Sequence, residues 1–467
     1  MSLTAAQIAH QVKTKERSAT SVVKAALTQI SNQENHNCFT TLLGSSALTA
    51  AETLDRQLAA GETVGPLAGV PFAVKNLFDI AGTVTLAGSK INQSHTPATQ
   101  DSTAVARLKA AGAILVGALN MDEYAYGFVT LNHHYGVTPN PHDPSRMSGG
   151  SSGGSAASVA AGLVPLTLGS DTNGSIRVPA SLCGVYGFKP TYGRLSRAGA
   201  YLFSSSLDHI GPFARSVEDI ALAFEVLQGP DSRDPICTDR PPIAPDLSGD
   251  MTGIRVAMAT GRSKTIATEY FSQGMTATVA QALEKVSSAL QVTQTVTLPE
   301  SARARAAAYL ITASEGSQLH LQRLQTRLQD FDPATRDRFV AGAMMPNSWY
   351  LQAQRFRRWY RDQVREIFKT VDLIIAPTTP CPAPLIDQTT MELDGQTVPI
   401  RPHLGHYTQP LSFIGLPVLS VPIFLPDQLP VGIQLIARPY DENTIFKAAV
   451  ALEKLGVTEA KVASSIG

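Results

Sequence analysis

Short runs of apolar residues alternate with helical segments along this chain, and this alternation limits the fold more than any other feature. The runs at 70–74, 113–117 and 163–170 are apolar almost throughout. Helical segments at 102–112 and 155–162 lie between them. Continuously apolar strands are typical of a sheet buried on both faces. The pattern therefore predicts an α/β fold in which helices cover both faces of a central sheet.

The alternation continues in the second half of the chain, and helical periodicity also opens it. We predict a single domain over residues 1–467, with an N-terminal helical region at about 1–62 and a helical insertion at about 265–370. The further elements that we expect are strands at 254–260, 371–380, 417–425 and 431–439, helices at about 268–290 and 442–455, and N-terminal helices capped by Thr4, by Ser18 or Ser21, and covering 47–60.

Composition excludes several classes of partner. The 38 basic residues balance the 38 acidic ones, so the sequence shows no electrostatic footprint for nucleic acid or an anionic membrane. No run of about 18 apolar residues could span a bilayer, and the first residues lack the apolar core of a signal peptide. The four cysteines have no CxxC spacing. We therefore expect a cytoplasmic protein that acts on a small molecule, without a metal or another cofactor.

The stretch SGGSSGGS at 148–155 admits several interpretations. A flexible linker fits poorly, because a small-residue helix and a strand follow without a polar spacer. A phosphate cradle lacks both GxxxxGK[ST] and GxGxxG. Gly149, Ser151 and Gly153 satisfy G-x-S-x-G, but a nucleophile elbow needs a preceding strand, and PNPHDPSRM is rich in proline. The remaining interpretation joins this stretch to a second Gly and Ser segment, GSDTNGS at 169–175, and to Lys75.

Lys75 ends the apolar strand in FAVKNLF and offers a base for a serine nucleophile. A serine hydroxyl reacts poorly until a base removes its proton. A lysine can do this only when it is neutral, which requires burial to lower its pKa from about 10.4. An ordinary surface or ion-paired lysine is the competing interpretation.

Three separated segments resemble the amidase signature family of Ser-Ser-Lys hydrolases. They are GVPFAVKN around Lys75, GGSSGGS at 149–155 and GSDTNGSIRVPASLCGVYGFKPTYGR at 169–194, and the resemblance extends over about 1–455. It implies the amidase signature fold, a mixed central sheet covered by helices. It also implies that Ser175 is the nucleophile, Ser151 the bridging serine and Lys75 the base.

The same resemblance implies roles for the residues around the triad. A cis peptide would hold Ser151 after Gly150, and the oxyanion hole would use the backbone amides of Thr172, Asn173, Gly174 and Ser175. Family members mostly read DTGGS where this chain reads DTNGS, so Asn173 adds a side chain beside that hole. A His209 base is not expected, because relatives commonly have glutamine at this position.

The substrate is predicted from two branches of the family. One comprises hydrolases of urea-like amides, such as biuret, 1-carboxybiuret and allophanate, and the other is the glutaminase component of the aminoacyl-tRNA amidotransferase. Asn173 and the histidines in RPHLGHYTQPLSF favour the first, of the 1-carboxybiuret or biuret type, with ammonia as a product. A non-catalytic scaffold subunit is a further alternative. The resemblance implies a homodimer or a complex with a small helical subunit. Residues that we expect at the substrate are Tyr124, Gly150, His406, Tyr407 and Gln409.

Overall fold

The computed structural model describes residues 1–260 and 270–463. Within these ranges one mixed sheet has eleven strands. In sheet order they are Phe39–Leu42 (β1), Ile114–Leu119 (β3), Pro71–Lys75 (β2), Leu166–Asp171 (β8), His209–Ala214 (β10), Tyr186–Lys189 (β9), Val418–Ile423 (β16), Val431–Ala437 (β17), Leu373–Pro377 (β13), Val256–Ala259 (β11) and Gln294–Val296 (β12). Parallel pairs join β3, β2 and β8 at one end and β13, β11 and β12 at the other, whereas the remaining pairs are antiparallel. The predicted α/β class with a mixed sheet is confirmed.

Helices flank this sheet, and small hairpins lie outside it. The α-helices are Ala5–Lys13 (α1), Ala19–Asn32 (α2), Gly44–Ala59 (α3), Thr103–Ala110 (α4), Gly153–Ala160 (α5), Arg177–Cys183 (α6), Val217–Leu227 (α7), Ala277–Ala289 (α8), Ser301–Thr326 (α9), Pro333–Ala343 (α10), Asn347–Ile367 (α11), Ile400–His403 (α12), Gln409–Ser412 (α13) and Glu442–Lys454 (α14). The hairpin strands are Leu131–Asn132 (β4), Gly136–Val137 (β5), Pro139–Asn140 (β6), Asp143–Met147 (β7), Thr390–Leu393 (β14) and Gln396–Pro399 (β15). Short 3-10 turns cover Glu34–His36, Lys90–Ser94, Glu123–Ala125 and Leu328–Asp330.

Local sequence signals place most helix starts correctly. Thr4 caps α1 and Ser18 caps α2, each by accepting a hydrogen bond from a first-turn amide. The helix expected from about 268 starts later, at Ala277, and the first two of those residues lie outside the described ranges. Gly274 has a left-handed backbone at φ +75°, which a continuing α-helix does not permit.

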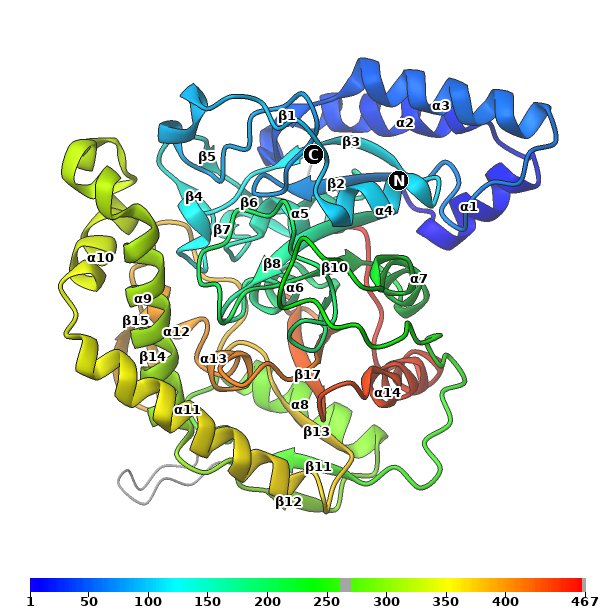
Figure 1. Cartoon of the computed structure of the whole chain (residues 1–467). Helices are drawn as coiled ribbons and strands as arrows, with labels where there is room; N and C mark the ends of the chain where they lie inside the picture. The colour runs from blue at the N-terminus through cyan, green and yellow to red at the C-terminus, as the bar shows by residue number, and fades with distance from the viewer. Residues whose placement is uncertain (261–269, 464–467) are drawn as a thin grey trace.

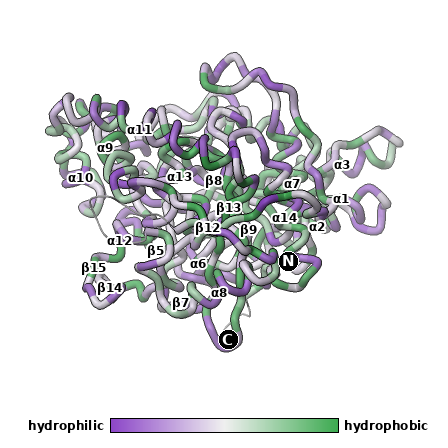
Figure 2. The backbone as a smooth tube through the Cα atoms, turned by 90° about the horizontal axis from the view of Figure 1, so that it is seen from below, coloured by the Kyte–Doolittle hydropathy of each residue, from purple (hydrophilic) through white to green (hydrophobic). Residues whose placement is uncertain are grey.

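The ends of the sheet are covered by different helices. In Figure 1 the N-terminal helices α1, α2 and α3 lie at the β1 end, whereas α8 lies at the β12 end and α9, α10 and α11 run along one side. Figure 2 shows hydrophobic segments gathered at the centre around β8, β9 and β13. Among the described helices, none is both long and apolar enough to cross a bilayer.

The register of three neighbouring strands brings the candidate catalytic segments together. β2 and β8 are parallel, with Val74 opposite Leu168, so Lys75 and Ser170 lie at the same edge of the sheet. β10 runs antiparallel to β8 and places His209 opposite Asp171. Lys75 and the GSDTNGS segment therefore meet because the carboxyl ends of parallel strands share one edge.

Candidate active site

Lys75 is completely buried and contacts two serine hydroxyls. Its Nζ donates to Ser151 Oγ at 2.6 Å and to Ser170 Oγ at 2.9 Å. Among the described residues no carboxylate lies within ion-pair distance of this amine. Burial lowers the pKa of Lys75 to about 7, against the opposing effect of the more distant Asp122, Asp208 and Asp171 carboxylates. An amine in this environment is available as a base near neutral pH.

Asp122 hydrogen-bonds to the turn that carries Ser151 and to the neighbouring backbone. The Gly150–Ser151 peptide bond is cis, as the family resemblance implied. The Asp122 amide donates to the Ser151 carbonyl oxygen at 3.2 Å, and its carboxylate accepts the amides of Val129 and Thr130 at 3.1 and 3.0 Å. A Cβ atom at Gly150 would overlap that carboxylate. The close approach of Asp122 therefore requires glycine at position 150.

Asp171 and Arg177 form a fully buried ion pair beneath the GSDTNGS segment. Arg177 Nε donates to Asp171 Oδ2 at 2.9 Å, and the same carboxylate accepts the Gly174 amide at 2.7 Å. Arg177 holds the pKa of Asp171 well below its usual range, although burial acts in the opposite direction. Because the Gly174 amide is already bonded, it is not free for an oxyanion. Among the described residues, the amides of Thr172, Asn173 and Ser175 have no hydrogen-bond acceptor, so the predicted hole is narrowed to these three.

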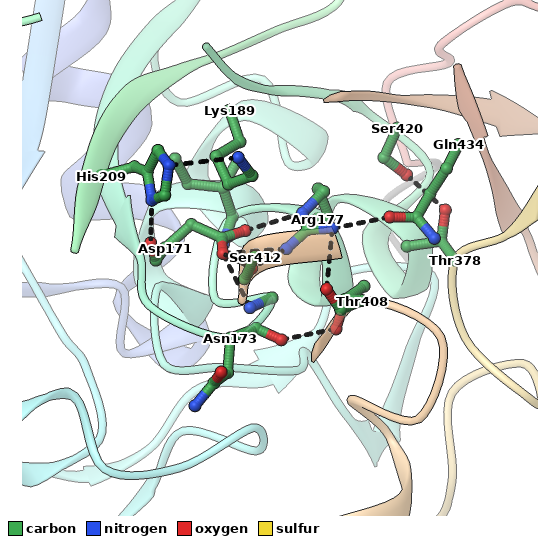
Figure 3. A network of polar contacts seen from close by, with 12 residues as sticks. Asp171, Asn173, Arg177, Lys189, His209, Thr378, Thr408, Ser412, Ser420 and Gln434 are labelled. Carbon is green, nitrogen blue, oxygen red and sulfur yellow. Dashed lines mark hydrogen bonds and ion pairs between the residues drawn. The ribbon is translucent and has the colours of Figure 1, made fainter. Parts of the chain in front are cut away.

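The segment before and within α13 packs against this turn from outside (Figure 3). Thr408 Oγ1 donates to the Asn173 carbonyl oxygen at 2.6 Å, and Arg177 Nη1 donates to the Thr408 carbonyl oxygen at 3.3 Å. A Cβ atom at Gly174 would overlap the Thr408 hydroxyl. The close approach of Thr408 explains why the second segment needs glycine at 174.

Ser175 opens onto a small cavity beside the turn. Thr172, Asn173 and Gln409 also line it, together with Tyr126, Phe128, Tyr309, Thr312 and Arg338. No hydrogen bond from the described residues engages the Ser175 hydroxyl. A carbonyl group bound in this cavity would therefore meet a free hydroxyl and three unpaired amides.

Asn173 lines this cavity, and one atom of its side chain has no hydrogen-bond partner among the described residues. Its Nδ2 donates to Thr312 Oγ1 at 2.9 Å, and Thr312 in turn donates to the Ala308 carbonyl oxygen at 2.7 Å. Because the Thr312 proton is used on Ala308, its oxygen must accept from Asn173, which fixes the orientation of the amide. Asn173 Oδ1 is then left buried without a partner among the described residues.

The structure brings only one of the other predicted substrate residues to the cavity. Gln409 lines it. Tyr124 is instead buried, with its hydroxyl on Asn92 Oδ1 at 3.1 Å and its ring against His320. His406 stacks on Tyr270, and the Tyr407 hydroxyl donates to the Gln273 carbonyl oxygen at 2.5 Å. In this structure these three side chains hold surrounding loops together and do not face the cavity.

The structure also bears on the alternatives for SGGSSGGS and His209 that the sequence raised. A short strand, β7, does precede SGGSSGGS, so our reason for rejecting a nucleophile elbow was wrong. The Ser151 hydroxyl nevertheless faces Lys75 and no histidine. His209 contacts the Asp171 carbonyl oxygen and Lys189, not Ser175.

The family follows from a match over most of the sequence. Residues 21–446 match the family model described as Amidase. The chain belongs to the amidase signature family. It is therefore an amidase, a hydrolase of carbon–nitrogen amide bonds.

Relatives of this amidase support the same assignment. It is 50% identical to AtzE, the 1-carboxybiuret hydrolase subunit of Pseudomonas sp. (strain ADP), over 429 residues, 91% of this chain and 92% of that protein. It is 38% identical to the A-type subunit of the glutamyl-tRNA(Gln) amidotransferase from Chloroflexus aurantiacus, over 97% of this chain and 96% of that protein. At this lower identity, the amidotransferase subunit is a poorer match to the chain than AtzE. A solved structure of a vestigial protein complex, described as revealing the evolutionary origins of an s-triazine catabolic enzyme, superposes with a TM-score of 0.95 at 47% identity, covering 98% of this chain and all of that one.

The surroundings of the triad include residues that the sequence did not indicate. Ser170 shares Lys75 with Ser151, and its position directly before Asp171 at the end of β8 was the available signal. Asp122 and Arg338 reach the site from β3–β4 and α10, and no spacing in the sequence connects them with Ser175.

Proposed function

We propose that Ser175 is the nucleophile of this amidase, Ser151 the proton relay and Lys75 the base. The observation that carries this proposal is the 2.6 Å contact between Lys75 Nζ and Ser151 Oγ in a site closed to solvent. Burial disfavours the charged amine, so a proton arriving from a serine finds a neutral acceptor.

The proton path balances in both halves of the reaction. Ser175 Oγ bonds to the amide carbon while its proton moves to Ser151 Oγ and the Ser151 proton moves to Lys75 Nζ. The proton then returns to the leaving nitrogen, the carbon–nitrogen bond breaks, and ammonia leaves a seryl acyl-enzyme. Water attacks the acyl carbon through the same relay and restores Ser175. The amides of Thr172, Asn173 and Ser175 would bind the oxyanion in each half.

We further propose that the substrate is a urea-like amide of the 1-carboxybiuret type. The 50% identity to a 1-carboxybiuret hydrolase subunit supports this class over glutamine. Asn173 Oδ1 is an unpaired acceptor beside Ser175, and urea-like amides are rich in N–H donors. Binding such a donor would satisfy a buried polar atom that is costly to leave unpaired.

Arg338 supplies the cation that a carboxylated substrate needs. It lines the cavity, lies over the Tyr126 ring with its Cζ 3.7 Å from the centroid, and donates to the Tyr126 carbonyl oxygen at 2.7 Å. Among the described residues it pairs with no carboxylate, so its guanidinium retains donors for a ligand. We assign Arg338 to the substrate carboxylate. Arg357 on α11 is less suitable, because it already donates to the carbonyl oxygens of Phe413 and Ser206.

Ammonia release by the native protein and by Arg338→Leu tests this substrate class. We expect the native kcat/KM for 1-carboxybiuret to exceed that for glutamine by about a hundredfold or more. Arg338→Leu should raise KM for 1-carboxybiuret by about 10- to 100-fold, because a charge-assisted hydrogen bond is lost. Biuret has no carboxylate, so its KM should change by less than about threefold.

Arg336→Leu is the matched control for this experiment. Arg336 lies on the same helix, α10, but pairs with Asp337 at 2.9 Å and does not line the cavity. It should leave KM for both compounds unchanged. Rapid glutamine hydrolysis without activity on biuret-like amides would instead favour the glutaminase alternative.

The pH dependence of the reaction follows from the Lys75 pKa. The base must be neutral, and its pKa is lowered to about 7. We therefore expect kcat/KM to rise about tenfold per pH unit below pH 7 and to level off above it. A profile measured with a neutral substrate such as biuret avoids titration of the substrate itself. A plateau that extends well below pH 6 would contradict the assignment of Lys75 as the base.

Assembly with another chain is a further proposal. The amidotransferase relative is one subunit of its enzyme, and the structural relative is described as part of a protein complex. We propose that this chain also assembles, as a homodimer or with a small helical subunit. Native mass spectrometry of the protein from its own source would distinguish a monomer from either assembly. The cytoplasmic location stays a prediction.

A further inference from the structure

Two buried basic residues, Lys189 and His209, lie directly behind the turn that carries the proposed oxyanion donors. Lys189 ends β9 and is fully buried, and His209 begins β10 and is 3% exposed. Lys189 Nζ approaches His209 Nε2 at 3.3 Å and also donates to the Leu416 carbonyl oxygen. His209 Nδ1 lies 3.1 Å from the carbonyl oxygen of Asp171 (Figure 3). Neither residue contacts Ser175, and the proton path described above uses neither of them.

The partners of His209 determine which ring nitrogen carries the proton. A carbonyl oxygen only accepts hydrogen bonds, so Nδ1 must hold the hydrogen that Asp171 receives. Nε2 of the neutral ring is then an acceptor, and it faces the donor Nζ of Lys189. Burial and the neighbouring lysine keep the pKa of His209 well below its ordinary value, in agreement with a neutral ring. The three groups form one chain of hydrogen bonds that runs from Lys189 through His209 to Asp171.

The last hydrogen bond of this series, from His209 to the Asp171 carbonyl oxygen, fixes the peptide group between Asp171 and Thr172. That peptide is trans and planar, so its N–H points away from its carbonyl oxygen. A bond that holds the Asp171 oxygen toward His209 therefore aims the Thr172 N–H in the opposite direction. Thr172 lines the cavity, and its amide has no acceptor among the described residues. The Thr172 side chain adds a second restraint, since Asp208 Oδ1 accepts its hydroxyl at 2.5 Å.

We propose that His209, oriented by Lys189, is a positioning residue that aims the Thr172 amide at the oxyanion formed on Ser175. This inference rests on the proposed nucleophile and deepens it. It predicts that loss of the hydrogen bonds from Lys189 to His209 and from His209 to Asp171 slows attack by Ser175 without weakening substrate binding. A glutamine at 209 should replace histidine, because its amide nitrogen can donate to Asp171 while its oxygen accepts from Lys189.

Two readouts test this role in the full-length protein: kcat and KM for ammonia release from biuret, and the rate of covalent labelling of Ser175 by a fluorophosphonate. In labelling, Ser175 Oγ attacks phosphorus and fluoride leaves, and negative charge develops on the phosphonyl oxygen at the same place during the attack. The reaction does not depend on the identity of the amide substrate. For His209→Leu we expect kcat and the labelling rate to fall by about 10- to 100-fold, below the loss for removing a whole donor. KM should change by less than about twofold, and His209→Gln should recover both rates to within about threefold.

Lys189→Met tests the same hydrogen bonds independently if His209→Leu does not fold. It removes the donor to Nε2 while replacing a buried amine with an apolar side chain of similar length, so the rates should fall in a folded protein. His142→Leu is the matched control, since His142 also bonds a backbone carbonyl, that of Cys183 at 3.0 Å, but lies outside this chain of bonds. Its rates should stay within about twofold of native.

Three results would overturn the proposal: native rates in both folded His209→Leu and folded Lys189→Met, a His209→Gln protein as slow as His209→Leu, or an equal loss in His142→Leu. Failure of the substrate proposal is distinguishable, because Ser175 would then still be labelled although biuret is not hydrolysed. A native protein whose Ser175 is not labelled would contradict both the nucleophile and its positioning residue.

Discussion

Replacing Ser175 with alanine is expected to reduce kcat for amide hydrolysis by at least about a thousandfold, the scale of loss seen when a nucleophile is removed from a serine hydrolase. Ser175 presents the free hydroxyl at the cavity, whereas Ser151 is engaged by Lys75 at 2.6 Å. The variant should fold normally, because no hydrogen bond from the described residues is lost with this hydroxyl. Ammonia release under saturating substrate measures the change, and thermal unfolding confirms the fold.

Ser155→Ala is the matched control for the nucleophile. Ser155 is buried in α5 and donates to the Leu168 carbonyl oxygen at 3.0 Å, outside the proton path. Its loss should affect stability more than rate. Mass spectrometry of a fluorophosphonate-labelled native protein adds a second check. A label on Ser151, or substantial hydrolysis by Ser175→Ala, would mean that G-x-S-x-G marks the nucleophile after all.

The structure brings together those predicted parts of the site whose sequence signal is local. Lys75 ends an apolar strand, and each Gly and Ser segment forms its own turn, so neighbouring residues determine their shape. The glycines at 150 and 174 have a cause that the sequence does not contain, the approach of Asp122 and Thr408. Both of those residues come from distant segments, and only the packed fold brings them to the turns.

The lining of the cavity beside Ser175 differs from the set of residues expected from the sequence, because it depends on backbone conformation and long-range packing. Tyr124 and Ala125 both have left-handed backbones, at φ 49° and 61°. Residues other than glycine rarely adopt this conformation, so the sequence alone does not show which side chains turn toward the cavity. Tyr126 lines it instead of Tyr124. Arg338 joins it because α10 packs beside the turn, which no spacing in the sequence reveals.

The two buried cations near the site, Arg177 and Lys75, differ in their hydrogen-bond partners. Asp171 contacts both Arg177 and the Gly174 amide, so the pair braces the GSDTNGS loop. In this ion pair the buried Arg177 guanidinium has a direct carboxylate partner. Lys75 has only hydroxyl partners, which stabilise the neutral amine as well as the ammonium. This difference supports the proposal that the ion pair provides rigid support and that Lys75 transfers protons.

Replacing Lys75 with methionine is expected to reduce kcat by at least about a thousandfold, because the relay then ends without a base. The same change should not lower stability at neutral pH and should raise it in acid. Removing a buried cation that lacks a paired carboxylate removes a desolvation cost, and methionine has a similar length. Activity and melting temperature should therefore move in opposite directions. Lys75→Arg should also be inactive, since a guanidinium stays protonated and cannot accept the serine proton.

The pH dependence of stability separates a neutral lysine from a charged one. The pKa of Lys75 is about 7 in the folded protein and about 10.4 in an unfolded chain, so the unfolded state binds more protons between these values. The native protein should therefore gain stability from this group as pH rises from about 7 toward 10, whereas Lys75→Met lacks this contribution. We expect the melting-temperature advantage of Lys75→Met to be largest below pH 7 and to shrink across that window. An advantage that stays constant with pH would show that Lys75 remains charged when folded, and an ammonium cannot serve as the base.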